Sequence, residues 1–346
     1  MTPKVSIIIP LYNSENKISG CLKSAMNQTE SDIEIIVVND GSTDKSGDVC
    51  DELSADDDRI TVIHQSNKGA GSARNKGLEL AKGEYLYFLD SDDKMEPNLV
   101  EENLHVLSQY NTDVLIFGYT KVEKGRKNTL EVNTRLKERQ LHSKQEIKEH
   151  LCRILEDGAT FAVWNKMFKR DLIVANNIKY PDMKRNQDMA FTLEALKHAN
   201  SISVNPKKYY YYSFNSEAFK YDQDLIKHHL IIYRKFYQLY ENWMEYSHNR
   251  AYAVRLFTLY FFHSVPFFIV TQDNQPLQKL RKLVTHSDFE EFVEKINFRD
   301  ADNSTVKGAL LILKFKNSLL LFSTTKFKLL LTNIFGKHFF RKLVNK

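Results

Sequence analysis

The sequence predicts an α/β protein in which a doubly wound, mostly parallel sheet over residues 1–220 is followed by a helical region over residues 221–346. Short apolar, β-branched runs alternate with segments of helical period over the first third of the chain. Such alternation is typical of βαβ units. Beyond about residue 222 the period becomes helical throughout, with no internal repeat, which places a domain boundary near residue 220.

The predicted elements follow in chain order. The first strand is Val5-Ser6-Ile7-Ile8-Ile9, an apolar run of the kind that is buried on both faces of a parallel sheet. Further strands are predicted at 33–38, 60–64, 85–89 and 113–122. Helices are predicted from Ser14 to Met26, over 43–53, from the Gly69–Gly71 turn to Leu80, and over 145–156. The charged stretch 123–145 is predicted to form surface loops.

Composition excludes several classes of protein. The 42% hydrophobic content is that of a globular chain. Cys21, Cys50 and Cys152 are too few and too scattered for a disulfide framework or a zinc site, which favours a reducing cytoplasm. No signal-peptide pattern precedes the first strand.

The net charge of +5 is unevenly distributed. Residues 307–346 contain nine Lys/Arg and no Asp/Glu, so the rest of the chain is mildly acidic. A nucleic-acid-binding face would need basic residues across the folded body, and we expect no nucleic-acid partner.

The turn after the first strand, Pro10-Leu11-Tyr12-Asn13-Ser14, contains no glycine. Dinucleotide-binding and P-loop proteins both use a glycine-rich turn at this position, so neither class is expected. A sugar nucleotidyltransferase, which needs a similar turn, is disfavoured for the same reason.

Polar side chains instead follow three strands that should end at one edge of the sheet: Tyr12, Asp40, and the pair Asp90 and Asp92. Two carboxylates at this spacing are suited to a hard divalent cation that also binds phosphate oxygens. Each feature also has an ordinary structural explanation. An acidic turn can be merely solvated, Asp40 can cap a helix, and Tyr12 can be a partly buried aromatic residue.

Four segments in this order resemble the successive motifs of the family 2 glycosyltransferases. They are Val5–Asn13, Val37–Asp44, Asn67–Gly77 and Phe88–Asp93, and weaker similarity continues to about residue 216. The resemblance implies a GT-A fold and an inverting transfer of a hexosyl or N-acetylhexosaminyl group from a nucleoside diphosphate sugar, with Mn²⁺ or Mg²⁺. It further implies a bacterial surface polysaccharide as the type of product.

The resemblance also assigns roles on the donor side. Pro10 and Tyr12 would line the base pocket, Tyr12 by stacking, and Asp40 would accept from the base N–H, which favours uracil and hence a UDP-sugar. Three further residues complete the set: Arg74 near the donor, Asp90 at the ribose or metal, and Asp92 as a direct metal ligand.

On the acceptor side, Asn186-Gln187-Asp188 resembles the family's Glu-Asp motif, with Asp188 as the catalytic base. An inverting transfer needs such a carboxylate to take the proton of the acceptor hydroxyl. The alternative is a helix N-terminal aspartate favoured by the macrodipole. Trp164-Asn165-Lys166 resembles the acceptor-side loop, in which Trp164 would stack on a sugar or be a buried structural residue.

Two positions depart from the family pattern. Gln187 stands where the family has Glu, and Ser213-Phe214 follows the tyrosine run where Arg or His is frequent. Lys207, Lys208 and Lys220 are the candidate replacements for that cation. These departures support an alternative function, a non-catalytic module that binds a sugar nucleotide or a glycan.

Residues 337–346 separate on a helical wheel into an apolar side, with Phe339 and Leu343, and a basic side, with Arg341 and Lys342. This pattern predicts an interfacial helix on an anionic membrane, so residues 307–346 are expected to contact the inner face of the cell membrane. A lipid-linked saccharide acceptor would fit that location. The alternatives are a helix packed on its own domain and an oligomer contact.

Overall fold

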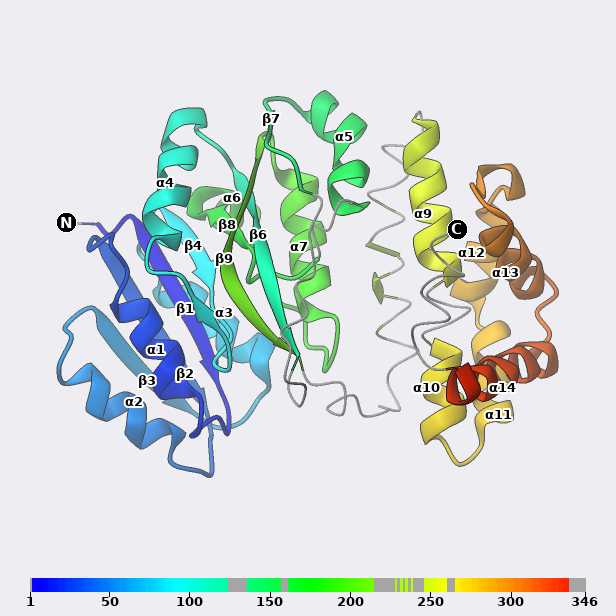
Figure 1. Ribbon diagram of the computed structural model, residues 1–346, viewed down its shortest axis with the longest axis horizontal. Coiled ribbons are helices and arrows are strands. Elements are labelled where there is room, and N and C mark those ends of the chain that lie inside the picture. The colour runs from blue at the N-terminus through cyan, green and yellow to red at the C-terminus, as the bar shows by residue number, and fades with distance from the viewer. Residues whose placement is uncertain are drawn as a thin grey trace. The chain divides into compact units, whose positions relative to one another are not determined.

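The computed structural model describes residues 2–123, 136–156, 161–214, 246–259 and 265–335, with isolated positions between 228 and 238. The chain divides into two compact units, Met1–Ser216 and Glu217–Lys346. The first unit holds the sheet and the second is helical (Figure 1).

The first half of the sheet consists of parallel strands in the order β3-β2-β1-β4. These are β1 (Val5–Leu11), β2 (Ile33–Asp40), β3 (Ile60–Gln65) and β4 (Tyr85–Phe88). Every residue of β1 is buried, because β1 lies between two strands and beneath helices on both faces. The four strands confirm the corresponding predictions from the apolar runs.

Helices cover both faces of these strands (Figure 1). On one face, α1 (Ile18–Met26) and α2 (Ser46–Ser54) share a buried cluster that includes Ile7, Ile9 and Leu22. On the other face lies α3 (Ala70–Leu80). A Cβ at Gly77 of α3 would lie 2.4 Å from Ile8 Cγ2, so a glycine is needed for α3 to approach β1 this closely.

The second half of the sheet continues in the order β4-β8-β6-β9-β5, and β7 pairs with β9. Its strands are β5 (Lys94–Met95), β6 (Val114–Glu123), β7 (Arg139–Leu141), β8 (Lys166–Lys169) and β9 (Ile202–Phe214). Strands β6 and β9 run in the same direction as β1 to β4, whereas β5, β7 and β8 run against their neighbours. The predicted α/β class with a mostly parallel sheet is therefore confirmed.

Four helices accompany these strands: α4 (Leu99–Tyr110), α5 (Lys144–Glu156), α6 (Arg170–Ala175) and α7 (Gln187–His198). The structure corrects the expectation of surface loops over 123–145, since β7 lies within that range and pairs with β9. A three-residue strand of polar character carries too little periodicity to be detected in the sequence.

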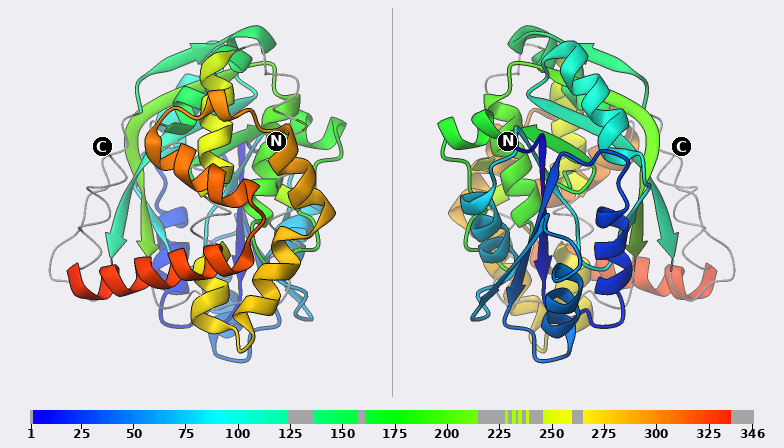
Figure 2. Two further views of the ribbon diagram at one scale, coloured as in Figure 1. Left: turned by 90° about the vertical axis from the view of Figure 1, so that its right-hand side faces the viewer. Right: turned by 90° about the vertical axis from the view of Figure 1, so that its left-hand side faces the viewer.

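The second unit is built from helices, as predicted (Figure 2). They are α9 (Ser247–Leu259), α10 (Val265–Gln272), α11 (Pro276–Val284), α12 (Ser287–Lys295), the 3₁₀ turn η3 (Phe298–Asp300), α13 (Ser304–Lys314) and α14 (Ser318–Phe335). α14 contacts α10, α11 and α13. Most of the helix predicted after Asp222, and the whole amphipathic segment 337–346, lie outside the described residues. Within the described part of the chain, no helix combines the length and apolarity needed to cross a membrane.

Candidate functional site

The loops that follow β1, β2 and β4 are bonded to one another at the carboxyl edge of the sheet. The side-chain oxygen of Asn13 accepts from the Thr43 N–H at 2.8 Å, and the Ser14 N–H donates to Ser46 Oγ at 2.7 Å. The hydroxyls of Ser14 and Ser91 are 3.1 Å apart. The structure thus brings the three strand ends together, as the strand-end rule predicts.

Tyr12 and Pro10 lie at the end of β1. The Tyr12 side chain follows the strand and is 49% exposed, so its ring can be reached by a ligand. Pro10 is buried within β1 opposite Val38. Pairing of β1 with β4 ends at Ile8–Phe88, so the missing N–H of Pro10 breaks no bond of the ladder there.

Asp40, at the end of β2, is buried and holds the loop before α3. Its Oδ1 accepts from Gln65 Nε2 at 2.7 Å and from the Lys68 N–H at 2.9 Å, and its Oδ2 accepts from the Gly69 N–H at 2.7 Å. A carboxylate has about four acceptor positions, so about one remains for a ligand donor. Asp40 therefore has a structural role that the sequence suggested only as helix capping.

Arg74 of α3 bridges the two acids that the sequence assigned to opposite sides of the reaction. Its Nη2 lies 2.7 Å from Asp90 Oδ1, and its Nη1 lies 3.1 Å from Asp188 Oδ1. The Arg74 side chain is 8% exposed, and its guanidinium stands 5.4 Å from the centroid of the Tyr180 ring. The bridge places Asp188, at the start of α7, directly beside the acidic turn that follows β4.

The ionisation of this cluster follows from burial and charge. Burial alone would lower the pKa of Arg74, but Asp188 and Asp90 raise it above its usual value. Burial raises the pKa of Asp188, Arg74 opposes that rise, and the neighbouring Asp90 adds to it. A carboxyl group with a raised pKa that is still held by a cation has the properties of a general base.

The remaining acids of the turn have different environments. Asp92 is partly exposed, and its Oδ2 lies 2.8 Å from Lys17 Nζ. Asp93 is buried and accepts from the Tyr210 hydroxyl at 2.7 Å, so it fixes the turn against β9. Asp90 and Asp92 together supply two carboxylates that suit Mn²⁺ or Mg²⁺ when phosphate and water complete the shell. Among the described residues no group of three or more His, Cys, Asp or Glu side chains forms a metal cage.

The segment before Asp188 is fastened to α3. Asn186 has a left-handed backbone conformation (φ 60°), and the Gln187 amide donates to the Met183 carbonyl. A Cβ at Gly71 would lie 2.6 Å from Gln187 Oε1, so the glutamine packs directly on the first turn of α3. A glutamate at position 187 could not donate to the carbonyl, which gives a structural reason for glutamine there.

Asn75 forms a second clamp between α3 and this segment. Its Nδ2 donates to the Tyr180 carbonyl, and its Oδ1 accepts from the Tyr180 N–H, both at 2.8 Å. Beside the clamp lies a polar cavity of about 650 Å³, lined in part by Lys68, Asp182 and Gln187. The cavity extends from the loop held by Asp40 to the residue before Asp188.

Of the two alternatives for Trp164, the structure favours the buried structural residue. The indole is only 6% exposed and stacks on Tyr210 and Tyr212, with ring centroids 4.7 and 4.9 Å away. Tyr119 meets it edge-on at 4.6 Å. These contacts make Trp164 part of the core behind the acidic turn, and its ring offers no face to a sugar.

Asn165 and Lys166 are also buried, so the expectation that they face the acceptor is corrected in the same way. Lys166 Nζ donates to the Ala162 carbonyl at 2.7 Å and to Asn165 Oδ1 at 2.8 Å. Burial lowers the pKa of Lys166 to about 7, and the charge of Asp188 opposes that shift. Lys166 therefore belongs to the electrostatic surroundings of Asp188.

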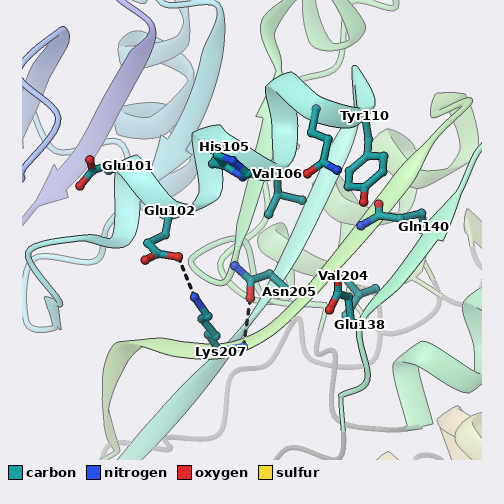
Figure 3. A pocket seen from close by; sticks show the side chains of 11 residues that line it. Glu101, Glu102, His105, Val106, Tyr110, Glu138, Gln140, Val204, Asn205 and Lys207 are labelled. Atoms are coloured by element: carbon teal, nitrogen blue, oxygen red, sulfur yellow. Dashed lines mark hydrogen bonds and ion pairs between the residues drawn. The ribbon is translucent and has the colours of Figure 1, made fainter.

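Of the lysines suggested as replacements for the missing Arg or His, Lys207 is held elsewhere. It pairs with Glu102 at 2.7 Å and lines a separate cavity of about 550 Å³ beside α4, with His105, Glu138 and Asn205 (Figure 3). Lys220 lies outside the described residues. Lys17, beside Asp92, is a further cation at the acidic turn, in addition to Arg74 on Asp90.

The sequence reasoning missed Lys17 and Asn75. Lys17 has one available signal, its position just before α1 on the loop that follows Tyr12. Asn75 stands next to Arg74 in the motif before Gly77, but its partner, Tyr180, is 105 residues away in sequence. No local pattern can indicate such a contact.

Comparison with known proteins gives the family. The model of Glycosyl transferase family 2 matches residues 6–173. EpsH of Bacillus subtilis (strain 168), named as a glycosyltransferase, is 35% identical over 238 residues, which are 67% of this chain and 67% of that protein. Poly(ribitol-phosphate) beta-glucosyltransferase of Bacillus spizizenii is 33% identical over 217 residues, 60% of this chain and 32% of the relative.

A crystal structure of residues 1–349 of S. aureus TarS in complex with UDP-GlcNAc has the same fold. It superposes with a TM-score of 0.70 at 22% identity and covers 93% of this chain and 90% of that one. The GT-A-type sheet and the helical region after it are thus both shared with a solved structure. With the EpsH match and the motifs gathered at the sheet edge, the chain belongs to the family 2 glycosyltransferases.

Proposed function

We propose that this glycosyltransferase is a metal-dependent, inverting enzyme that moves a hexosyl or N-acetylhexosaminyl group from a UDP-sugar to a hydroxyl of a glycan or lipid-linked saccharide. The observation that carries the proposal is the Arg74 bridge. It holds a donor-side acid, Asp90, and a candidate base, Asp188, on one guanidinium at 2.7 and 3.1 Å. A metal-dependent inverting transfer needs a base on the acceptor side of the reacting carbon and metal-binding carboxylates on the donor side, within one small site.

In this proposal Asp188 takes the proton of the acceptor hydroxyl while that oxygen attacks the anomeric carbon. The bond from the anomeric carbon to the diphosphate breaks in the same step, and UDP leaves from the opposite face. The side chain of Asp188 is 30% exposed, which gives the acceptor access to the carboxylate. The positive charge that develops on the sugar is stabilised by the nearby carboxylates, as in glycoside hydrolysis.

On the donor side we propose that the uracil stacks on Tyr12 and donates to the remaining acceptor position of Asp40. Asp92, with Asp90, would hold Mn²⁺ or Mg²⁺, which supplies positive charge for the departing diphosphate. Lys17 lies 2.8 Å from Asp92 and would provide a second cation in the same place. This assigns to Lys17 the role that an Arg or His after the tyrosine run has in other family members.

The choice of a UDP-sugar is supported by the UDP and UDP-GlcNAc complexes of TarS, whose fold this chain shares. The cavity beside Asn75 is the proposed acceptor site, because it is polar and ends at Gln187, next to Asp188. It replaces the acceptor surface first expected around Trp164. We further propose that the enzyme works in cell-surface polysaccharide synthesis at the inner face of the cell membrane.

A donor-hydrolysis screen tests the proposal. Purified protein is incubated with Mn²⁺ and a panel of UDP-, GDP- and dTDP-sugars, and nucleotide release is measured. We expect slow release from a UDP-sugar that is abolished by EDTA and by Asp92→Ala. Turnover that is insensitive to EDTA would refute the metal requirement. UDP binding without turnover, even with a panel of saccharide acceptors, would favour the non-catalytic module.

A further inference from the structure

The outer face of α13 and α14 carries a row of exposed apolar side chains, which we call the α13–α14 patch. It comprises Leu311 (48% exposed), Phe315 (67%), Leu319 (62%), Leu320 (39%) and Phe327 (61%). Single exposed apolar residues are common on protein surfaces, but several on two neighbouring helices are typical of an interaction site.

Within each helix, the spacing places exposed apolar residues near one another. Leu311 and Phe315 are one turn apart at the end of α13, and Leu320 and Phe327 are two turns apart on α14. The opposite sides of both helices are also apolar, with Leu310 and Leu321 buried in the unit. The core of the second unit therefore does not account for the outer apolar row.

Lysines lie among the exposed apolar residues. Lys307 and Lys314 are exposed on α13, where Lys314 Nζ donates to the Ile296 carbonyl at 3.0 Å, and Lys326 is exposed next to Phe327 on α14. No Asp or Glu occurs from residue 307 to the end of the sequence. Glu290 and Glu294 of α12 are paired with Lys316, which lies between the two helices. The patch is therefore both apolar and basic.

This combination decides between two occupants. In a symmetric dimer formed through the patch, the same lysines would face each other across the contact and repel. An anionic lipid surface instead attracts the lysines and accepts the phenylalanine and leucine side chains between its headgroups. Charge complementarity therefore favours the lipid surface.

We propose that the α13–α14 patch binds anionic phospholipid headgroups and holds the enzyme on a membrane. This inference deepens the proposed function, on which it rests, by identifying the contact surface within the described residues. The patch lies within residues 307–346, which the sequence led us to expect at the membrane, and it places the contact on α13 and α14 and not on residues 337–346. Vesicle binding requires no turnover, so its failure would leave the donor and base assignments intact.

The test is flotation of the full chain with vesicles of phosphatidylcholine alone or with 30% phosphatidylglycerol, a composition of about one anionic lipid in three. We expect binding only to the anionic vesicles, weakened at high salt as the Debye length shrinks. The variant Lys307→Gln/Lys314→Gln/Lys326→Gln should lower the partition coefficient on the order of a hundredfold, at about fivefold per lysine. Phe315→Ser/Leu319→Ser should lower it by at least about tenfold.

A matched control is Val174→Ser/Lys82→Gln, which removes an apolar residue that is 56% exposed and an exposed lysine, both from the first unit. The control should bind vesicles like the wild type. All variants change exposed side chains, so circular dichroism and UDP binding should be unchanged. Absence of wild-type binding to anionic vesicles overturns the proposal. Undiminished binding by both patch variants overturns it too. The proposal is also overturned if sedimentation shows a dimer that the patch variants abolish and no vesicle binding is seen.

Discussion

Replacing Arg74 by methionine should move the acid limb of the pH–rate profile to higher pH. In the wild type, burial raises the pKa of Asp188 and the Arg74 guanidinium opposes that rise. Asp188 must be ionised to accept the hydroxyl proton, so its pKa sets the pH at which activity is lost on acidification. Removing the cation leaves burial and the charge of Asp90 to raise the pKa further, while Lys166 alone opposes them.

The strength of the interaction between Arg74 and Asp188 follows from the geometry. Arg74 Nη1 lies 3.1 Å from Asp188 Oδ1, so the two charge centres are about 4 Å apart. At an effective dielectric constant of about 20, opposite charges at about 4 Å attract each other by roughly 4 kcal/mol. Because the Asp188 side chain is 30% exposed, solvent screening makes the interaction weaker than this figure, and the acid limb should still move to higher pH.

The assay is kcat/KM for sugar transfer measured from about pH 4 to 9, a range that brackets the ordinary and raised pKa values of a carboxyl group. Arg74→Lys retains a cation but cannot bond both carboxylates in parallel, so its acid limb should move less than that of Arg74→Met. Lys82→Met, at an exposed position outside the site, should leave the profile unchanged. An active, folded Arg74→Met enzyme with an unmoved acid limb would refute the role of Arg74 in setting the pKa of Asp188.

Three further predictions concern the fold and the donor site. Asn75→Ala leaves the Tyr180 N–H and carbonyl unpaired, so we expect a loss of about 1–3 kcal/mol in the free energy of unfolding and a lower kcat; unchanged values would refute the clamp. Gly77→Ala places a methyl group 2.4 Å from Ile8 Cγ2, so the free energy of unfolding measured in urea should fall by about 1–3 kcal/mol. An unfolding midpoint equal to that of the wild type would contradict the close approach of α3 to β1. Tyr12→Ala removes an exposed ring, so steady-state kinetics should show an unchanged kcat. The KM for the UDP-sugar should rise about tenfold, which is the loss expected from one base-stacking contact. An unchanged KM would exclude stacking.

The parallel half of the sheet could be predicted from the sequence because its strands are buried on both faces. β1 is a continuous apolar run that gives an unambiguous signal. Strands β5 and β7 were missed because they contain two and three residues, too few for any periodicity. The place of β8 between β4 and β6, antiparallel to both, depends on long-range pairing that no local pattern encodes.

The part of the site that lies at the ends of the strands could be predicted from the sequence. Asp40, Asp90 and Asp92 follow buried strands, and parallel strands bring their carboxyl ends to one edge. The bridge from Arg74 to Asp188 was not predictable, because α3 and α7 are far apart in the chain and meet only through tertiary packing. The burial of Trp164 was left open for a similar reason: its stacking partners come from β9.

The central claim is that Asp188 is the catalytic base, held beside the donor site by Arg74. The most direct measurement compares Asp188→Asn with the wild type in UDP binding and in sugar transfer. Asparagine has nearly the same shape but cannot take a proton, so UDP affinity should stay within about threefold while transfer falls by about 10²–10⁴-fold. Transfer by Asp188→Asn within about tenfold of wild type, with UDP binding intact, would contradict the account.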